Sequence, residues 1–204
     1  MNSIKILLCA LLFVTASFNN TAGLTDSERK YASGLLQESR KTLLTKVKEL
    51  TPAQLSFKAD SSSWSVAQCV EHITIIENGL FDYAQSALKV PADPSKRNEV
   101  KLRDEDVLKM VADRSSKFQA PESAKPNGKF GDFQATVKEF ISRRENHINY
   151  INTTTDDLRN HYNDFPFGKI DAYQTIVFMA GHCKRHTAQI DEIMQNANFP
   201  KAVK

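Results

Sequence analysis

Residues 171–197 read DAYQTIVFMAGHCKRHTAQIDEIMQNA, and this stretch decides the fold. It follows Gly168 closely and begins at Asp171, a residue type that caps helices. Its apolar residues recur every three or four positions, which is the spacing of one face of an α-helix. They are Tyr173, Ile176, Val177, Ala180, Ile190 and Met194. The stretch therefore predicts a long helix that buries one face.

Three earlier stretches have the same amphipathic character. The first opens with the capping box Thr25–Glu28 and runs to Leu50, before Thr51-Pro52 stops it. The second opens with another box, Ser65–Gln68, and its apolar face extends to Leu88. The third runs from Asp132 to about Ile151. Four long amphipathic helices with few strand-like runs predict an all-α four-helix bundle.

A long polar connection separates the second and third of these helices. Residues 90–104 carry Pro91 and Pro94, residues 104–118 have the pattern of a short helix, and residues 119–131 are rich in helix breakers. We interpret the connection as a crossover within one domain, and this domain spans residues 24–204. A single further turn is expected where Thr155 can act as a cap.

The composition is that of an ordinary globular protein. The 204 residues include 27 basic and 24 acidic side chains, a formal charge of +3, and 41% are hydrophobic. Near-balanced charge does not indicate bulk nucleic-acid binding. Disordered, fibrous and low-complexity classes are also excluded.

Residues 1–23 have the pattern of a secretory signal peptide. Lys5 precedes an apolar run, residues 6–14, which gives way to small and polar residues. We expect cleavage between Ala16 and Gly23. An uncleaved anchor is the alternative, although the run is well short of the ~20 residues that a membrane span needs. The mature chain is therefore expected to be exported, periplasmic or secreted, without a stable membrane span and in oxidising surroundings.

Three of the five histidines are placed where they can meet. His182 and His186 are four positions apart on the last predicted helix, so they project from one face about 40° apart. His72 lies next to the apolar face of the second predicted helix and can supply a third nitrogen. Imidazole suits Zn, Ni, Cu or ferrous iron. The alternative is ordinary surface or core-edge histidines that donate to backbone carbonyls.

The surrounding motifs resemble those of a known family. They are Trp64-Ser65, Glu71-His72-Ile73, Gly168-Lys169-Ile170-Asp171 and the run Gly181–Ile190 with its H-x-x-x-H-x-x-Q-I pattern. In these features the chain is similar to the DinB-like superfamily of damage-inducible, YfiT-type proteins. The resemblance spans essentially the whole chain after the leader.

The resemblance implies an up-down-down-up bundle with one divalent metal ion, commonly zinc or nickel, held by His72, His182 and His186. Together with the metal preference of imidazole, it leads us to expect Zn, Ni or Fe. It also implies metal-dependent hydrolases, or transferases that use small thiols. Such transferases depend on a cytosolic thiol pool, so the predicted export favours hydrolysis or plain metal binding.

Two cysteines lie beside the candidate ligands. Cys69 precedes His72 by three residues, and Cys183 directly follows His182. Three interpretations stay open: buried small apolar residues, a disulfide between two helices, and thiolate ligands.

Two further polar residues adjoin the candidate ligands. Glu71 is 100° from His72 around the helix and is expected to face solvent. Gln189 follows His186 by three residues, where it can donate to a ligand or substrate or can simply be exposed.

The remaining histidines lie away from this group in the sequence. His161 precedes the last helix and is a candidate rim residue or substrate contact. His147 lies with Arg143 and Arg144 on the third helix, where the three residues predict a solvated basic face or an anion site.

Three hypotheses for function follow. The first is an exported metal-dependent hydrolase of a small substrate. The second is a non-catalytic metal-binding or stress-response bundle that pairs with a second copy. The third is a metal-free bundle that contacts other proteins.

Overall fold

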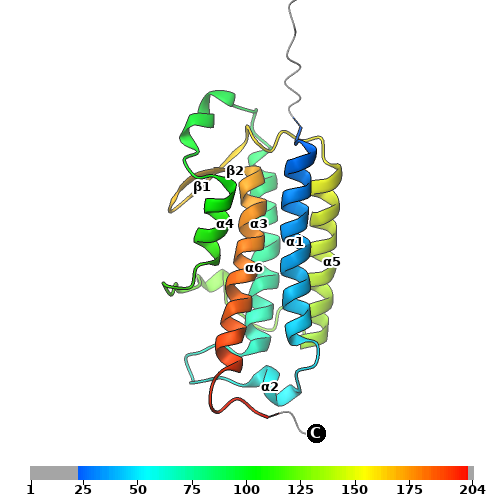
Figure 1. Cartoon of the computed structure of the whole chain (residues 1–204), viewed down its shortest axis with the longest axis vertical. Coiled ribbons are helices and arrows are strands. Elements are labelled where there is room, and N and C mark those ends of the chain that lie inside the picture. Colours follow the sequence, from blue (N-terminus) through cyan, green and yellow to red (C-terminus); the bar gives the residue numbers. More distant parts are fainter. Residues whose placement is uncertain (1–22, 202–204) are drawn as a thin grey trace, which may run out of the picture.

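Four long helices dominate the computed structural model, which describes residues 23–201 (Figure 1). They are α1 (Asp26–Val47), α3 (Val66–Ala87), α5 (Phe133–Thr153) and α6 (Ala172–Met194). Each packs against two others, because α1 and α3 both contact α5 and α6. This arrangement confirms the predicted all-α four-helix bundle. Apart from Gly23, the predicted signal peptide lies outside the described residues.

Side-chain caps explain where the long helices begin. Thr25, Ser65 and Asp171 each form a reciprocal capping box with the residue three positions later. Asp132 caps α5 by accepting a hydrogen bond from the backbone nitrogen of Ala135, at 2.8 Å. Caps of this kind are worth about 1 kcal/mol each. The predicted helix starts are therefore confirmed.

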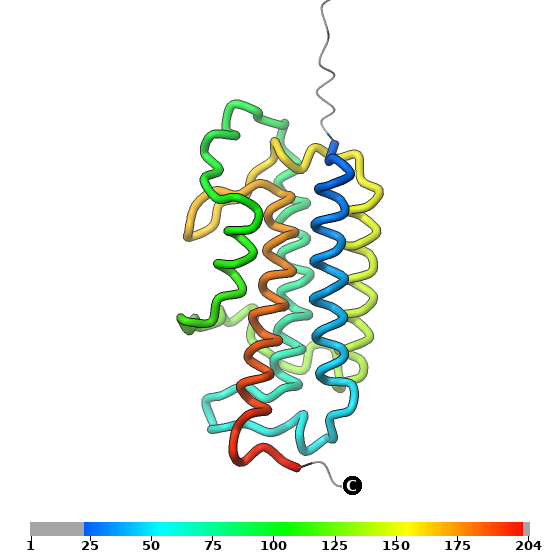
Figure 2. Tube along the Cα trace, in the orientation of Figure 1, coloured from blue at the N-terminus to red at the C-terminus, as the bar shows by residue number. Residues whose placement is uncertain are grey.

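The long crossover makes α3 and α5 run in the same direction (Figure 2). The chain passes along α1, returns along α3, crosses back outside the bundle, runs along α5 parallel to α3, and returns along α6. This is the up-down-down-up order that the family resemblance implies.

The crossover contains η1 (Pro94–Glu99), α4 (Asp104–Ala112) and η2 (Glu122–Ala124). Helix α4 packs directly on α6. The contact is close at Gly181, where a Cβ atom would lie 3.1 Å from the carbonyl oxygen of Leu108. The short helix was expected to reach residue 118. It stops at Ala112 because Asp113 is extended and its carboxylate binds the backbone nitrogen and hydroxyl of Ser115.

Other local predictions need correction. Helices α1 and α6 end three residues before the predicted Leu50 and Ala197, because the chain there closes into turns. The short elements were not predicted: the helix α2 (Pro52–Ser56), the crossover helices η1 and η2, and the antiparallel hairpin formed by β1 (Tyr162–Phe165) and β2 (Gly168–Asp171). Gly168 has a φ of 124°, which L side chains rarely adopt.

The helical turn expected at Thr155 is absent. The preceding residue, Thr154, instead accepts a hydrogen bond from the backbone nitrogen of Asp156 at 3.1 Å, which forms a turn outside any helix.

An ionic cluster crosses the middle of the bundle. Arg144 is 0% exposed and donates two hydrogen bonds of 2.6 Å to Glu77 on α3. It also donates to the carbonyl of Leu36 and the hydroxyl of Ser39 on α1, at 2.9 and 2.7 Å. His147 lies 3.0 Å from the same Glu77 carboxylate. The predicted solvated face or anion site at Arg144 and His147 is therefore wrong, because a carboxylate on another helix satisfies both.

Within residues 23–201, none of the helices combines the length and the apolar composition that a bilayer span requires.

Candidate metal centre

The three candidate ligands meet between α3 and α6. His72 lies in the second turn of α3, whereas His182 and His186 occupy successive turns of α6. One nitrogen from each ring lies within 4.8 Å of the others. The Nε2 atoms of His72 and His182 are 3.2 Å apart. Within the described part of the chain, no cysteine or carboxylate joins this group.

Hydrogen bonds fix which nitrogen of two rings faces the centre. The Nδ1 of His72 is 2.7 Å from the carbonyl oxygen of Ala124, and the Nδ1 of His186 is 2.8 Å from Oε1 of Gln189. Both partners are acceptors, so each Nδ1 carries the proton and donates it. Each Nε2 therefore presents a lone pair toward the shared centre.

Burial keeps these imidazoles neutral. Burial lowers the pKa of His72, although its hydrogen bond to Ala124 opposes the shift. Burial and the charges of His186 and His72 lower the pKa of His182 strongly. Burial and the charge of His72 lower the pKa of His186 to about 3. A neutral imidazole is the form that binds metals.

The spacing of the nitrogens fits a single metal ion. A tetrahedral ion with metal–nitrogen bonds of 2.0–2.1 Å separates two ligand nitrogens by about 3.3 Å. The Nε2 atoms of His72 and His182 match this separation at 3.2 Å. A set of three imidazoles is also chemically suited to zinc, nickel or ferrous iron.

Aromatic rings border the centre. His72 and His186 are 4% and 8% exposed, whereas His182 is more exposed. The Trp64 ring lies 4.7 Å from the His72 ring and 6.2 Å from the His186 ring. On the other side, Phe178 is stacked at 6.4 Å from His182. His182 is therefore the most exposed of the three candidate ligands.

The crossover segment between Arg114 and Ala124 is linked to the candidate ligands by hydrogen bonds at both ends. At one end, Ala124 in η2 accepts the bond from His72. At the other end, Arg114 donates a 3.4 Å bond to Gln189, which in turn binds His186. Gln189 thus acts as an acceptor for a candidate ligand, not as a donor.

Glu71 also binds the crossover. Its side chain accepts hydrogen bonds from the backbone nitrogens of Asn127 and Lys129, at 3.1 and 2.8 Å. The expectation that Glu71 faces solvent is therefore wrong, since the residue is only 9% exposed. A buried acceptor for two loop amides holds the loop beside His72.

The other candidates lie outside the centre. His161 contacts the carbonyl oxygens of Asp157 and Val90, at 2.6 and 3.0 Å, and so links two loops instead of lining a rim. Cys69 and Cys183 are free and 0% exposed. Burial raises the pKa of Cys69 to about 12 and also raises that of Cys183. Of the three interpretations of the cysteines, the structure supports buried apolar residues.

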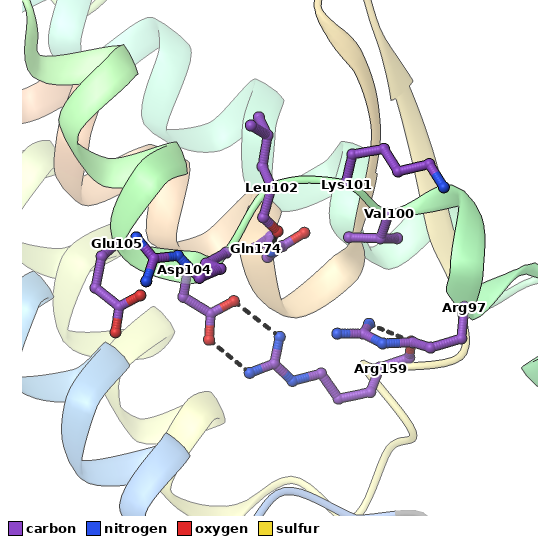
Figure 3. A pocket seen from close by; sticks show the side chains of 9 residues that line it. Arg97, Val100, Lys101, Leu102, Asp104, Glu105, Arg159 and Gln174 are labelled. Carbon is purple, nitrogen blue, oxygen red and sulfur yellow. Dashed lines mark hydrogen bonds and ion pairs between the residues drawn. The ribbon is translucent and has the colours of Figure 1, made fainter.

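The surface of the described residues also has cavities away from the three histidines. One, of about 380 Å³, lies where the crossover meets α6, and Figure 3 shows Arg159 paired there with Asp104. The other, of about 500 Å³, is lined by residues of α1 and α5. None of the three histidines lines either cavity. The arginine at the first cavity is already paired, since Arg159 also binds Asp171 and Glu28.

Comparison with known proteins agrees with this fold. A sequence model of the DinB superfamily matches residues 35–190. "Uncharacterized protein YuaE" from Bacillus subtilis (strain 168) is 24% identical over 162 residues, which cover 79% of this chain and 96% of YuaE.

Among solved structures, YfiT from Bacillus subtilis superposes with a TM-score of 0.57 at 15% identity. The match covers 84% of this chain and 89% of YfiT. YfiT is described as "a probable metal-dependent hydrolase with an unusual four-helix bundle topology". At this identity the likeness establishes the shared fold.

Proposed function

The chain belongs to the DinB superfamily, and from this premise we propose that it binds one divalent metal ion and hydrolyses a small substrate. His72, His182 and His186 are the proposed ligands. The convergence of their three ring nitrogens is the observation that carries the proposal. The description of YfiT as a probable metal-dependent hydrolase supports it.

Three protein ligands suit catalysis better than a purely structural role. Structural zinc sites close with four protein ligands, whereas catalytic sites have three and leave a position open. No fourth protein ligand joins the histidines among residues 23–201. A bound divalent ion would supply Lewis-acid activation of water or of a substrate carbonyl.

The chain's own residues prepare and shield the centre. Ala124 and Gln189 orient two imidazoles through their Nδ1 protons. Trp64 and Phe178 border the rings and limit the access of water. A substrate would enter beside His182, which is partly exposed.

Metal analysis of purified protein tests the site. We expect one metal ion per chain, and we expect His182→Ala to lose it because two nitrogens remain. His161→Ala is the matched control, since it removes an imidazole that contacts only backbone carbonyls. Equal trace metal in the wild type and in His182→Ala would contradict the proposed site.

Hydrolysis is tested separately with a panel of esters, amides and lactones. Turnover should disappear when the metal is removed and return when it is restored. Stoichiometric metal with only background rates would support the second hypothesis, a non-catalytic metal-binding bundle. The proposed export is tested by finding the mature protein outside the cytoplasm with its first ~20 residues removed.

A further inference from the structure

Arg185 lies on α6 between the two candidate ligands of that helix. It follows His182 by three residues, so these two side chains are neighbours on the helix surface, and it directly precedes His186 in the chain. Arg185 is only 8% exposed.

No carboxylate within the described residues forms an ion pair with Arg185. Its one protein hydrogen bond joins Nη2 to the carbonyl oxygen of Ser116, at 2.5 Å. Neighbouring arginines differ: Arg114 pairs with Glu192, and Arg144 pairs with Glu77. A guanidinium has five N–H donors, so most of those of Arg185 have no protein acceptor.

The unused donors of Arg185 remain accessible. None of its nitrogens is among the fully buried polar atoms that lack a partner. Its guanidinium carbon lies 5.2 Å from the ring centre of Phe118, which is 80% exposed. A small ligand can therefore approach the guanidinium from solvent.

The charge around the centre is also unbalanced. Imidazoles bind a metal in their neutral form, so three of them leave the charge of a divalent ion uncompensated. Arg185 adds a further positive charge, which the charges of Asp113 and Glu192 oppose without forming an ion pair with it, and Glu192 pairs with Arg114. Glu71 is occupied by two loop amides. An anionic ligand would supply the missing negative charge.

We infer that Arg185 is a specificity-determining residue that binds an anionic oxygen group of the substrate, a carboxylate or a phosphate, beside the metal. This inference rests on the proposed function and names its substrate class. Guanidinium is suited to the role because its planar fork binds two oxygens of such a group at once.

Anion titrations of the Co²⁺-loaded protein test the inference without any activity assay. Acetate, inorganic phosphate and the neutral analogue acetamide are added separately, and the visible absorption of Co²⁺ reports binding. Cobalt content is measured for every variant. We expect acetate or phosphate, but not acetamide, to bind, and Arg185→Gln to weaken that binding at least tenfold with cobalt content unchanged.

Arg143→Gln is the matched control, because it removes an arginine on α5 that pairs with Glu139. Its anion affinity should equal that of the wild type. Arg185→Lys retains the charge without the planar fork, so it should bind the anion several-fold more weakly than the wild type does. If Arg185→Gln does not fold, the anion affinity of Arg185→Lys tests the role of Arg185 in its place.

Failure of the inference is distinguishable from failure of the metal site. Full cobalt loading with the same anion affinity in the wild type and in both Arg185 variants would overturn the role of Arg185 and leave the metal site intact. A wild type that binds no cobalt would overturn the proposed function. Calorimetric titration of the metal-free protein then decides: Arg185-dependent anion binding supports the subsite, and its absence overturns it.

Discussion

Gln189 shows how a single residue outside the ligand set prepares the centre. Its Oε1 atom accepts the Nδ1 proton of His186 and a second hydrogen bond from Arg114. We expect Gln189→Leu to lower zinc affinity by about 10- to 100-fold, the usual cost of losing such a partner. Competition with a chromogenic chelator measures the change.

Gln37→Leu provides the comparison for Gln189→Leu, since it removes an exposed glutamine from α1. Its zinc affinity should match that of the wild type. Equal affinities in all three proteins would show that Gln189 does not orient His186.

The sequence predicts the histidines better than it predicts their partners. Helical periodicity places His182 and His186 on one face and His72 near the apolar face of its own helix. The acceptor for His72 is a backbone carbonyl, that of Ala124, and a carbonyl has no sequence signature. Arg144 and His147 were misread because Glu77, which binds both, is at least 67 residues away along the chain.

At the scale of elements, the buried ion pair joins three of the four long helices. Burial opposes ionisation of Glu77, but the charge of Arg144 and the hydrogen bonds from His147 and Arg144 outweigh it, so the pKa of Glu77 falls. Glu77→Gln should lower the free energy of unfolding by about 3–5 kcal/mol, because it leaves a buried guanidinium without its counter-charge. Urea denaturation at pH 7 measures the loss.

The lowered pKa of Glu77 also sets how the stability of the protein depends on pH. The ionised Glu77 contributes stability above its ordinary pKa of 4.5, and this contribution disappears as the pH falls through the lower value of the folded state. The stability difference between wild type and Glu77→Gln should therefore shrink in that range. Glu139→Gln breaks only the exposed pair with Arg143 and should cost about 0–1 kcal/mol. Equal losses in the two variants would contradict a special role for the buried pair.

Local sequence signals identify the long elements and miss the short ones. Capping residues and periodicity locate α1, α3, α5 and α6 because each signal lies within the helix that it defines. Strands β1 and β2 have four residues each, too few for an alternating pattern to be evident. The hairpin instead depends on contacts with α3 and α6 that are distant in sequence.

At the scale of the whole molecule, a metal ion at this centre would cross-link α3 and α6 and also fix the crossover through His72 and Ala124. Zinc at 100 times its Kd should therefore add about 2.7 kcal/mol of stability. For a domain of this size that corresponds to a rise in Tm of roughly 5–10 °C. Thermal unfolding with zinc and with a chelator measures the shift.

His182→Ala is the control for this whole-molecule effect. Its Tm should be the same with zinc and with chelator. A zinc-dependent rise of equal size in the variant would place the stabilising ion elsewhere on the protein.

Trp64 is the only tryptophan in the 204 residues, and its indole lies against the rings of His72 and His186. The ultraviolet fluorescence of the protein therefore originates largely at Trp64. Any ion or small molecule that binds beside the indole alters the intensity or the wavelength of that fluorescence. The chain carries a built-in optical probe, so occupancy can be followed in real time without attaching a dye.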